Sequence, residues 1–514
     1  MSSFAELLLH QFDKNAEKPA IIYHGEIFTF GQLESKARNI GAFLQDKGLE
    51  KGDRVILYTP EKLPFLIIHL GIILSGGVSL PLNFRFTKNE LLYFINDSGS
   101  CFVFVSGEQA SLINQIKDRC PTLREIISPA EAIVKNDSRR FKEPNLRAED
   151  SCFMLYSSGT TGRPKGVVHT HMNLASSLLD LKICWRFVPE DILLNVLPLF
   201  HIHGLSFATH LSLISGASMI LEDKFHPNKT MEKIRDATVF MAVPTIYYAF
   251  LRRHEFTKKA REWNKTRLFT CGSAPIRTEV LPELETILKG PLINRYGMTE
   301  SHVITSLPLD GPFPQGSVGL PLDGVEMKLV DKDGRTLSAG TTREDNHKAV
   351  GEVKIRSKNL FSHYWNNPAA SASAFDKEGF FSTGDLGYID EFGFLTLVGR
   401  KKDLIITDGY NVYPAIVERV LNSFTQVRES AVIGVPDEKR GEKVIAVVVP
   451  DGHLHTGELK KYCQENLVNY QVPERFELVD ELPRNAMGKI LKRVLRDKFS
   501  EPGFPADADN PLHI

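Results

Sequence analysis

The sequence predicts an α/β protein, with a large N-terminal domain of parallel βαβ sheets plus a small barrel-like sheet, and a smaller α+β C-terminal domain. Short, apolar, β-rich runs alternate with helical patterns as far as residue 310. From residue 311 the runs are shorter and are separated by hairpin-type turns, which indicates antiparallel strands. After residue 400 helices and strands alternate on a smaller scale. We therefore expect two domains, residues 1–400 and 401–514.

The strands expected in the N-terminal domain are almost continuously apolar, as strands covered by helices on both faces are. Helical periodicity lies between them, for example in residues 29–48 and 87–99. The longest apolar run, Phe65–Leu74, is too short to span a membrane and predicts a buried helix. We expect strands at residues 53–59, 101–107, 151–158, 191–198, 217–221 and 238–244.

Composition argues against several classes of protein. Lys and Arg number 62 against 63 Asp and Glu, so the charge balance indicates neither nucleic-acid binding nor a basic membrane-binding arm. The N-terminus lacks the pattern of a signal peptide, and its Phe4, Leu7, Leu8 and Phe12 suit one face of a helix. The six cysteines are never spaced as CxxC, which disfavours disulfides and zinc sites. We expect a soluble cytoplasmic protein with no membrane span and small-molecule partners, working as a monomer or a homodimer.

The stretch YSSGTTGRPKG, residues 156–166, could be a flexible linker or a loop that holds an anion. Glycine lets the backbone approach a ligand closely, and successive N–H groups form a concave anion site. The stretch is not a Walker A motif, because Pro164 precedes Lys165 and Gly166 follows it. A strand-like run leads into it, and the helical pattern of residues 171–182 follows. The order of strand, glycine loop and helix predicts a phosphate-binding loop.

Five segments in the same order resemble the adenylate-forming superfamily of acyl-CoA synthetases, firefly-type luciferases and peptide-synthetase adenylation domains. Besides the glycine-rich loop they are YGMTE (296–300), STGDLG (382–387), GRKKDLIITDGYNVYP (399–414) and PRNAMGKILKR (483–493). The resemblance implies an AMP-forming carboxylate–CoA ligase that uses ATP, Mg²⁺ and coenzyme A. Such an enzyme makes an acyl-adenylate and then transfers the acyl group to the thiol of coenzyme A. The resemblance also implies that the C-terminal domain is a mobile lid.

Adenylation brings two anions together, so its site must neutralise charge and align the reactants. The resemblance implies that Lys489 on the lid offsets the charge that develops at the α-phosphate. It implies that Thr299 bonds the α-phosphate and that Glu300 is the Mg²⁺ ligand. The other implied positions are Ser157, Ser158, Gly159, Thr160, Thr161, Gly162 and Lys165 for the ATP phosphates, Tyr296 for adenine, Asp385 for ribose, Arg400 for ribose or phosphates, Lys402 for the hinge, and Gly409 with Tyr410 for the pantetheine tunnel.

The acid is predicted less directly. Residues 185–205, 239–251 and 294–300 resemble malonyl-CoA synthetases, which implies malonate or a related short dicarboxylate. Arg295 would then receive the distal carboxylate, because an unpaired buried charge is expensive. By the same resemblance Ser273 borders the acyl pocket, and His201 lines or gates it before coenzyme A enters.

Two departures from that group stand against malonate. Ala249 occupies a position where the group usually carries a basic residue, and residues 309–319 lack an arginine often seen there. Arg252 and Arg253 could compensate. The open alternatives are a ligase for short or medium fatty acids or for aryl acids, an adenylation enzyme that loads a carrier protein in trans, a luciferase-type oxygenase, and a non-catalytic nucleotide-binding protein.

Overall fold

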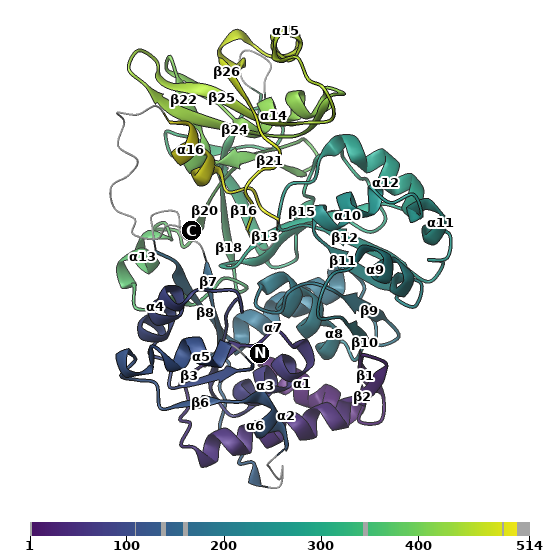
Figure 1. Ribbon diagram of the computed structural model, residues 1–514, viewed down its shortest axis with the longest axis vertical. Helices are drawn as coiled ribbons and strands as arrows, with labels where there is room; N and C mark the ends of the chain where they lie inside the picture. Colours follow the sequence, from purple (N-terminus) through teal and green to yellow (C-terminus); the bar gives the residue numbers. More distant parts are fainter. Residues whose placement is uncertain are drawn as a thin grey trace.

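Figure 1 shows the architecture of the computed structural model, which describes residues 3–107, 109–134, 140–157, 163–342, 348–485 and 488–500. In these residues, three sheets form the N-terminal part of the molecule. A fourth sheet belongs to the C-terminal part, drawn in green to yellow at the top of the view. The predicted α/β architecture with a smaller C-terminal domain is confirmed.

The largest sheet has nine strands in the order β15-β14-β13-β12-β11-β9-β10-β1-β2. The strands from β13 to β1 pair in parallel, while β14 and β15 at one edge and β2 at the other are antiparallel. The bounds are β1 (Pro19–Tyr23), β2 (Glu26–Thr29), β9 (Ile192–Asn195), β10 (Ser218–Leu221), β11 (Val239–Ala242), β12 (Leu268–Cys271), β13 (Leu292–Met298), β14 (His302–Ser306) and β15 (Leu320–Pro321).

A seven-stranded sheet has the order β19-β8-β7-β4-β3-β5-β6. Its strands pair in parallel from β7 to β6, while β8 and β19 add an antiparallel edge. The bounds are β3 (Arg54–Tyr58), β4 (Val78–Pro81), β5 (Phe102–Val105), β6 (Glu125–Ile127), β7 (Ser151–Ser157), β8 (Lys165–Thr170) and β19 (His363–Tyr364). All six apolar runs predicted as strands are confirmed, as β3, β5, β7, β9, β10 and β11.

The small sheet expected after residue 311 has five antiparallel strands in the order β17-β16-β18-β20-β21. They are β16 (Val325–Val330), β17 (Thr336–Leu337), β18 (Gly351–Ser357), β20 (Phe381–Ile389) and β21 (Leu395–Arg400). The C-terminal part places β22 (Ile405–Thr407), β23 (Tyr410–Val412), β24 (Val427–Asp437), β25 (Gly441–Pro450) and β26 (Arg475–Leu478) beside α14 (Pro414–Ser423), α15 (Thr456–Asn466) and α16 (Lys492–Phe499). The expected boundary after residue 400 falls between β21 and β22.

Several helices begin where a side chain satisfies their first free N–H groups. Ser3 with Glu6, and Thr29 with Gln32, form capping boxes at the starts of α1 and α2.

The helices predicted at residues 29–48, 87–99 and 171–182 are α2, α4 and α7. The helices of the N-terminal part are α1 (Phe4–Lys14), α2 (Phe30–Asp46), α3 (Lys62–Leu74), α4 (Lys88–Ser98), α5 (Gln109–Asn114), α6 (Pro129–Val134), α7 (His171–Cys184), α8 (Leu211–Ile214), α9 (Pro227–Ile234), α10 (Pro244–Leu251), α11 (Phe256–Ala260), α12 (Leu281–Leu288) and α13 (Pro368–Ser373).

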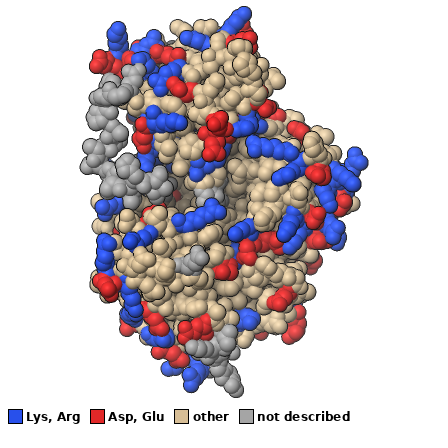
Figure 2. Space-filling model, viewed as in Figure 1, with Lys and Arg blue, Asp and Glu red and all other residues tan. Residues whose placement is uncertain are grey.

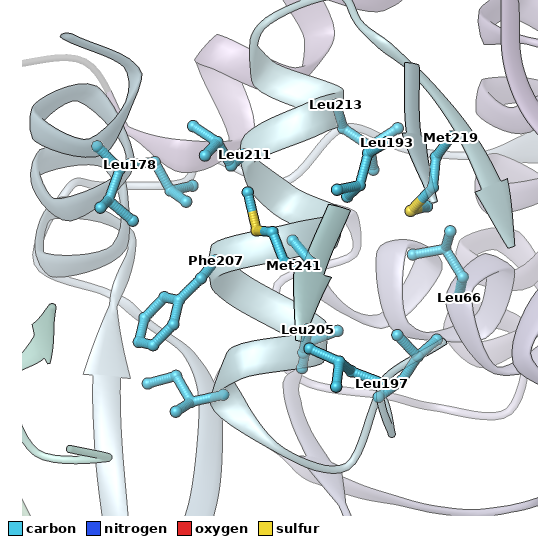
Figure 3. Close-up of a cluster of buried hydrophobic side chains, with 14 of the residues drawn as sticks. Leu66, Leu178, Leu193, Leu197, Leu205, Phe207, Leu211, Leu213, Met219 and Met241 are labelled. Carbon is cyan, nitrogen blue, oxygen red and sulfur yellow. The ribbon is translucent and has the colours of Figure 1, made fainter. Parts of the chain in front are cut away.

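The main core surrounds a π-helical segment, η3 (His203–His210), which continues into α8. Figure 3 shows Leu205 and Phe207 of this segment and Leu211 of α8 among side chains of α3, α7 and the nine-stranded sheet, including Leu178 and Met241. A π-helix is rare and usually marks a functional site. Side chains of this segment contact both the predicted acyl pocket and a set of buried histidines.

The glycine-rich loop differs from the prediction of strand, loop and helix. Residues 165–170 form β8, which pairs antiparallel with β7, so the loop closes a β-hairpin. Helix α7 begins only at His171, six residues beyond Lys165, so its N-terminus does not follow the loop directly. The expectation of a helix N-terminus at the phosphates was therefore wrong. Ser158, Gly159, Thr160, Thr161 and Gly162 lie outside the described residues.

Charged side chains of both signs are mixed on the surface, and the cysteines are unpaired. Figure 2 shows Lys and Arg interspersed with Asp and Glu over the face in view. All six cysteines are free thiols, and five of them are buried. Across the described ranges, no helix has the length and apolar character needed to cross a membrane.

Gly71 provides a test of the packing between α2 and the fully buried α3. A Cβ atom there would lie 2.6 Å from both the carbonyl oxygen of Ala37 and the Cβ of Ile40. Overpacking of this kind costs about 1–3 kcal/mol, so Gly71→Ala should lower the free energy of unfolding by that amount in urea titration. Gly290→Ala is the control, because nothing lies within 4 Å of its added Cβ. An equal effect of both substitutions would contradict the close helix contact.

Candidate active site

Glu300 connects the YGMTE segment to the glycine-rich hairpin. It lies in the turn between β13 and β14, and its Oε1 accepts hydrogen bonds from Ser157 Oγ (3.0 Å) and Tyr364 Oη (3.3 Å). The Lys165 Nζ lies 4.9 Å from the centre of the Tyr364 ring. Three segments far apart in the sequence therefore meet at one carboxylate. Burial raises the pKa of Glu300.

Asp385 forms a second junction. Its Oδ2 accepts a 2.6 Å hydrogen bond from the hydroxyl of Tyr296, and its Oδ1 lies 3.0 Å from Nε of Arg400. The negative charge of Asp385 raises the pKa of Arg400. The aromatic residue of YGMTE, the aspartate of STGDLG and the arginine of GRKKD are thus brought together by β13, β20 and β21.

Lys489 comes to this junction from the C-terminal part. Burial, followed by the charge of Arg400, lowers the pKa of Lys489 to about 8. The lysine loop rests on α10, because a Cβ on Gly488 would lie 2.6 Å from Cγ2 of Thr245. Lys402 is exposed, and its positive charge also lowers the pKa of Lys489. The structure therefore places the lid lysine, the hinge candidate and the Asp385 junction in one region.

Gly409 and Tyr410 are not part of that region in this structure. Both are exposed, with 55% of Tyr410 open to solvent, and the Tyr410 ring stacks on Tyr470 at 4.5 Å between centroids. The C-terminal part therefore presents the segment with Lys489 to the Asp385 junction and leaves the turn between β22 and β23 outside.

Arg295 is a buried cation with no acidic partner among the described residues. It is 2% exposed, and its guanidinium donates one 3.3 Å hydrogen bond to Ser273 Oγ while its Nε has no partner. It lies over the ring of Phe207 at 4.9 Å, and burial lowers its pKa to about 10. Ser273 Oγ also lies 3.2 Å from Nδ1 of His203. These side chains, from the loop after β12, from β13 and from η3, form a polar cluster suited to an anion.

Known proteins match this chain over nearly its whole length. The family model "AMP-binding enzyme" matches residues 8–365, and "AMP-binding enzyme C-terminal domain" matches residues 416–489. The chain belongs to the AMP-binding enzyme family. The predicted membership of the adenylate-forming superfamily is thereby confirmed.

The relatives are CoA ligases with different acids in their names. A long-chain-fatty-acid–CoA ligase of Yersinia pestis is 33% identical, over 98% of this chain and 95% of its own. An oxalate–CoA ligase of Arabidopsis thaliana is 35% identical, over 90% of this chain and 92% of its own. The crystal structure of ATP-bound MatB from Rhodopseudomonas palustris superposes with a TM-score of 0.91 at 37% identity, covering 97% of this chain and 99% of that chain.

Some expectations about this AMP-binding enzyme need correction. Arg252 and Arg253 are exposed just beyond the end of α10, so they do not replace the basic residue missing at Ala249. His203 was not among the predicted site residues, although PLFHIHG offered it beside His201. His201 contacts Phe200, and burial lowers its pKa to about 4.

Glu300 fits a divalent cation in this family. The Glu300 carboxylate is buried among hydroxyl partners, and no Lys or Arg of the described ranges forms an ion pair with it. No group of three or more metal-ligating side chains occurs in the described part of the chain. Mg²⁺ needs no such group when it is shared with ATP, because one carboxylate plus phosphate oxygens are its usual ligands.

The lone charge of Arg295 has a measurable consequence for stability. Arg295→Met removes a buried cation without leaving an acid unpaired, so the melting temperature should stay the same or rise. Arg267→Met is the matched control, because Arg267 binds the buried Asp191 through Nε at 2.9 Å. That variant should lose about 3 kcal/mol of unfolding free energy. Equal destabilisation of the two variants would mean that Arg295 has a structural partner.

Proposed function

We propose that this chain is an AMP-forming CoA ligase whose acid carries a second negative group, with malonate or a related short dicarboxylate as the leading candidate. The observation that carries the choice of acid is Arg295, a buried guanidinium with no acidic partner in the described residues. A distal carboxylate would satisfy it and would also accept from Ser273. The relative named as an oxalate–CoA ligase supports the proposal, because oxalate is a short dicarboxylate.

In the first step a carboxylate oxygen attacks the α-phosphorus of ATP and pyrophosphate leaves. We propose that Lys165 and the hairpin loop bind the phosphates, while Thr299 and Lys489 meet the charge that develops at the α-phosphate. Asp385 and Arg400 would bind the ribose, and Tyr296 would stack on adenine. Mg²⁺, held by Glu300, would supply positive charge to the phosphates when bound.

In the second step the thiol of coenzyme A attacks the acyl carbonyl and AMP leaves. The lysine loop occupies the site in this structure, so the lid has to turn about Lys402 before Gly409 and Tyr410 can line a pantetheine tunnel. His201 lies two residues before η3 and would then open the acyl pocket to the thiol of coenzyme A. Because all six cysteines are free thiols, we also propose a reducing compartment such as the cytoplasm.

A monocarboxylate is the second candidate. Ala249 stands where malonyl-CoA synthetases usually have a basic residue, and Arg252 and Arg253 point to solvent. Several relatives are named as ligases for long-chain fatty acids. In that case Arg295 would have to be satisfied by another group.

An acid panel separates these candidates. Pure protein, ATP, Mg²⁺ and coenzyme A would be incubated with malonate, methylmalonate, acetate, butyrate, octanoate or benzoate, and pyrophosphate and CoA esters measured together. Malonate or methylmalonate should give the highest kcat/KM. A winning monocarboxylate would contradict the dicarboxylate assignment, pyrophosphate without a CoA ester would indicate another acceptor, and no pyrophosphate from any acid would contradict the ligase itself.

Arg295→Met should remove the preference for a dicarboxylate. Loss of a buried charged hydrogen-bond partner costs about 2–5 kcal/mol, so kcat/KM for malonate should fall by about two orders of magnitude. The kcat/KM for butyrate should change little or rise. A parallel fall for both acids would indicate a general loss of the active site.

The lowered pKa of Lys489 predicts that adenylation becomes less efficient at alkaline pH. The protonated amine is the active form, so kcat/KM for ATP should fall with unit slope as the pH rises above about 8, where Lys489 loses its proton. Lys489→Arg keeps its charge throughout this range, so its remaining activity should show no such fall. The profile is measured as pyrophosphate release between pH 6 and about 9.5, a range on both sides of the titration. An unchanged alkaline limb in the variant would exclude Lys489 as its cause.

A further inference from the structure

Two hydrogen-bonded histidine pairs lie in the core beside the active site. His302 Nε2 lies 3.1 Å from His169 Nδ1, and His69 Nε2 lies 2.8 Å from His210 Nε2. All four rings are 0% exposed. A buried imidazole without a carboxylate partner is neutral, so one nitrogen donates and the other accepts. None of the four has a part in the two-step reaction described above.

The two histidine pairs make the same kinds of contact but lie in different parts of the core. His302 also meets Ser206 Oγ at 3.4 Å, and His69 also meets Ser79 Oγ at 2.7 Å. Each of these histidines therefore contacts one histidine and one serine. Only His302 belongs to the hairpin that carries Glu300. The His69 pair lies between α3 and η3, so it serves as an internal comparison.

His302 occupies a strained position. Its pairing with Met298 closes the β13–β14 hairpin, and the turn between them is Thr299, Glu300 and Ser301. Its φ is 57°, in the left-handed region that favours glycine. A side chain there is kept when its contacts offset the strain, and such outliers gather at functional sites. We therefore attribute the conformation of His302 to the contacts of its imidazole.

The contacts of His302 fix the turn to the strand that begins with Lys165. His169 lies on β8, four residues beyond Lys165, and stacks on Phe153 of β7 at 4.7 Å. Burial lowers the pKa of His169 to about 3, so its imidazole is neutral. On the other side, Ser206 belongs to η3, whose Phe207 lies under Arg295. The imidazole thus joins the Glu300 turn to both the phosphate hairpin and the acyl side.

We propose that His302 and His169 are positioning residues that set the Thr299–Glu300 turn against β8, so that the Mg²⁺ ligand and the α-phosphate ligand meet the phosphates held by Lys165. The proposal rests on the proposed function, because it assumes that Mg²⁺ and ATP bind here. Neither histidine touches substrate. Their effect is on the geometry of Glu300 and Thr299, and such outer contacts typically change metal affinity or activity by about 10–100-fold.

The test measures binding of ATP by calorimetry, with and without Mg²⁺, in the absence of any acid or coenzyme A. His302→Gly accepts the same φ without strain and removes the imidazole, so the turn should still form. In this variant the increase in ATP affinity that Mg²⁺ brings to the wild type should shrink by about tenfold or more. His302→Asn tolerates the left-handed conformation and keeps a hydrogen-bonding side chain, so it should recover part of the increase.

His69→Asn is the matched control, because it removes an equally buried imidazole with the same two kinds of partner. Its melting temperature should fall as the core loses a hydrogen-bonded ring, while its Mg²⁺-dependent increase in ATP affinity should stay at the wild-type value. The Mg²⁺ concentration that gives half-maximal pyrophosphate release should rise in His302→Gly, rise less in His302→Asn and stay at the wild-type value in His69→Asn.

The outcomes separate this inference from the proposed function. If the wild type binds ATP with help from Mg²⁺ and His302→Gly keeps the full increase, the positioning role is overturned and the ligase assignment stands. If His69→Asn loses the increase as well, the effect belongs to core stability and the positioning role is again overturned. If the wild type itself shows no Mg²⁺-assisted ATP binding, the proposed nucleotide site is wrong and this inference falls with it.

Discussion

The positive charge of Arg295 sits in the core of the molecule, where none of the described acidic side chains meets it. An isolated buried charge costs several kcal/mol, so a chain that keeps one without a partner gains something other than stability. The neighbouring backbone at Gly272 and Ser273 fits closely around the guanidinium. A Cβ on Gly272 would lie 2.6 Å from its Nε, and Ser273 takes a φ of 72° beside it. The anion that we propose as substrate would give this guanidinium the partner that the described residues do not supply.

One short segment connects Arg295 to the proposed nucleotide site. Strand β13 carries Arg295 and then Tyr296, whose hydroxyl binds Asp385, and the next turn holds Glu300 against Ser157. The residues that we propose for the acyl group, the ribose and the metal are therefore consecutive along a few residues of backbone. A shift of this segment would move all three at once, and the proposed positioning role of His302 at its far end would prevent that shift. The C-terminal part adds Lys489, through the contact of Gly488 with Thr245.

Much of this could be predicted from the sequence, and the failures have physical reasons. The parallel strands were predictable because strands buried on both faces are continuously apolar. Strand β8 was missed because Pro164 and Gly166 flank its first residue and the helical pattern resumes at His171, so residues 165–170 resembled the end of a loop. Arg252 and Arg253 follow the motif in sequence, but α10 ends before them and they face solvent.

The role of η3 was also hidden, because HGLSFATH carries no signal that separates a π-helix from an α-helix. Its contacts with Arg295 and His302 arise only when three distant segments pack together.

The most direct test of the central claim compares malonate with its monomethyl ester. The two acids have nearly the same shape at the reacting end, and only malonate carries a second charge. If Arg295 receives that charge, kcat/KM for CoA-ester formation should favour malonate by about two orders of magnitude, the loss expected for an unpaired buried cation. Equal values for the two acids, or a preference for the ester, would contradict the account and leave Arg295 without its anion.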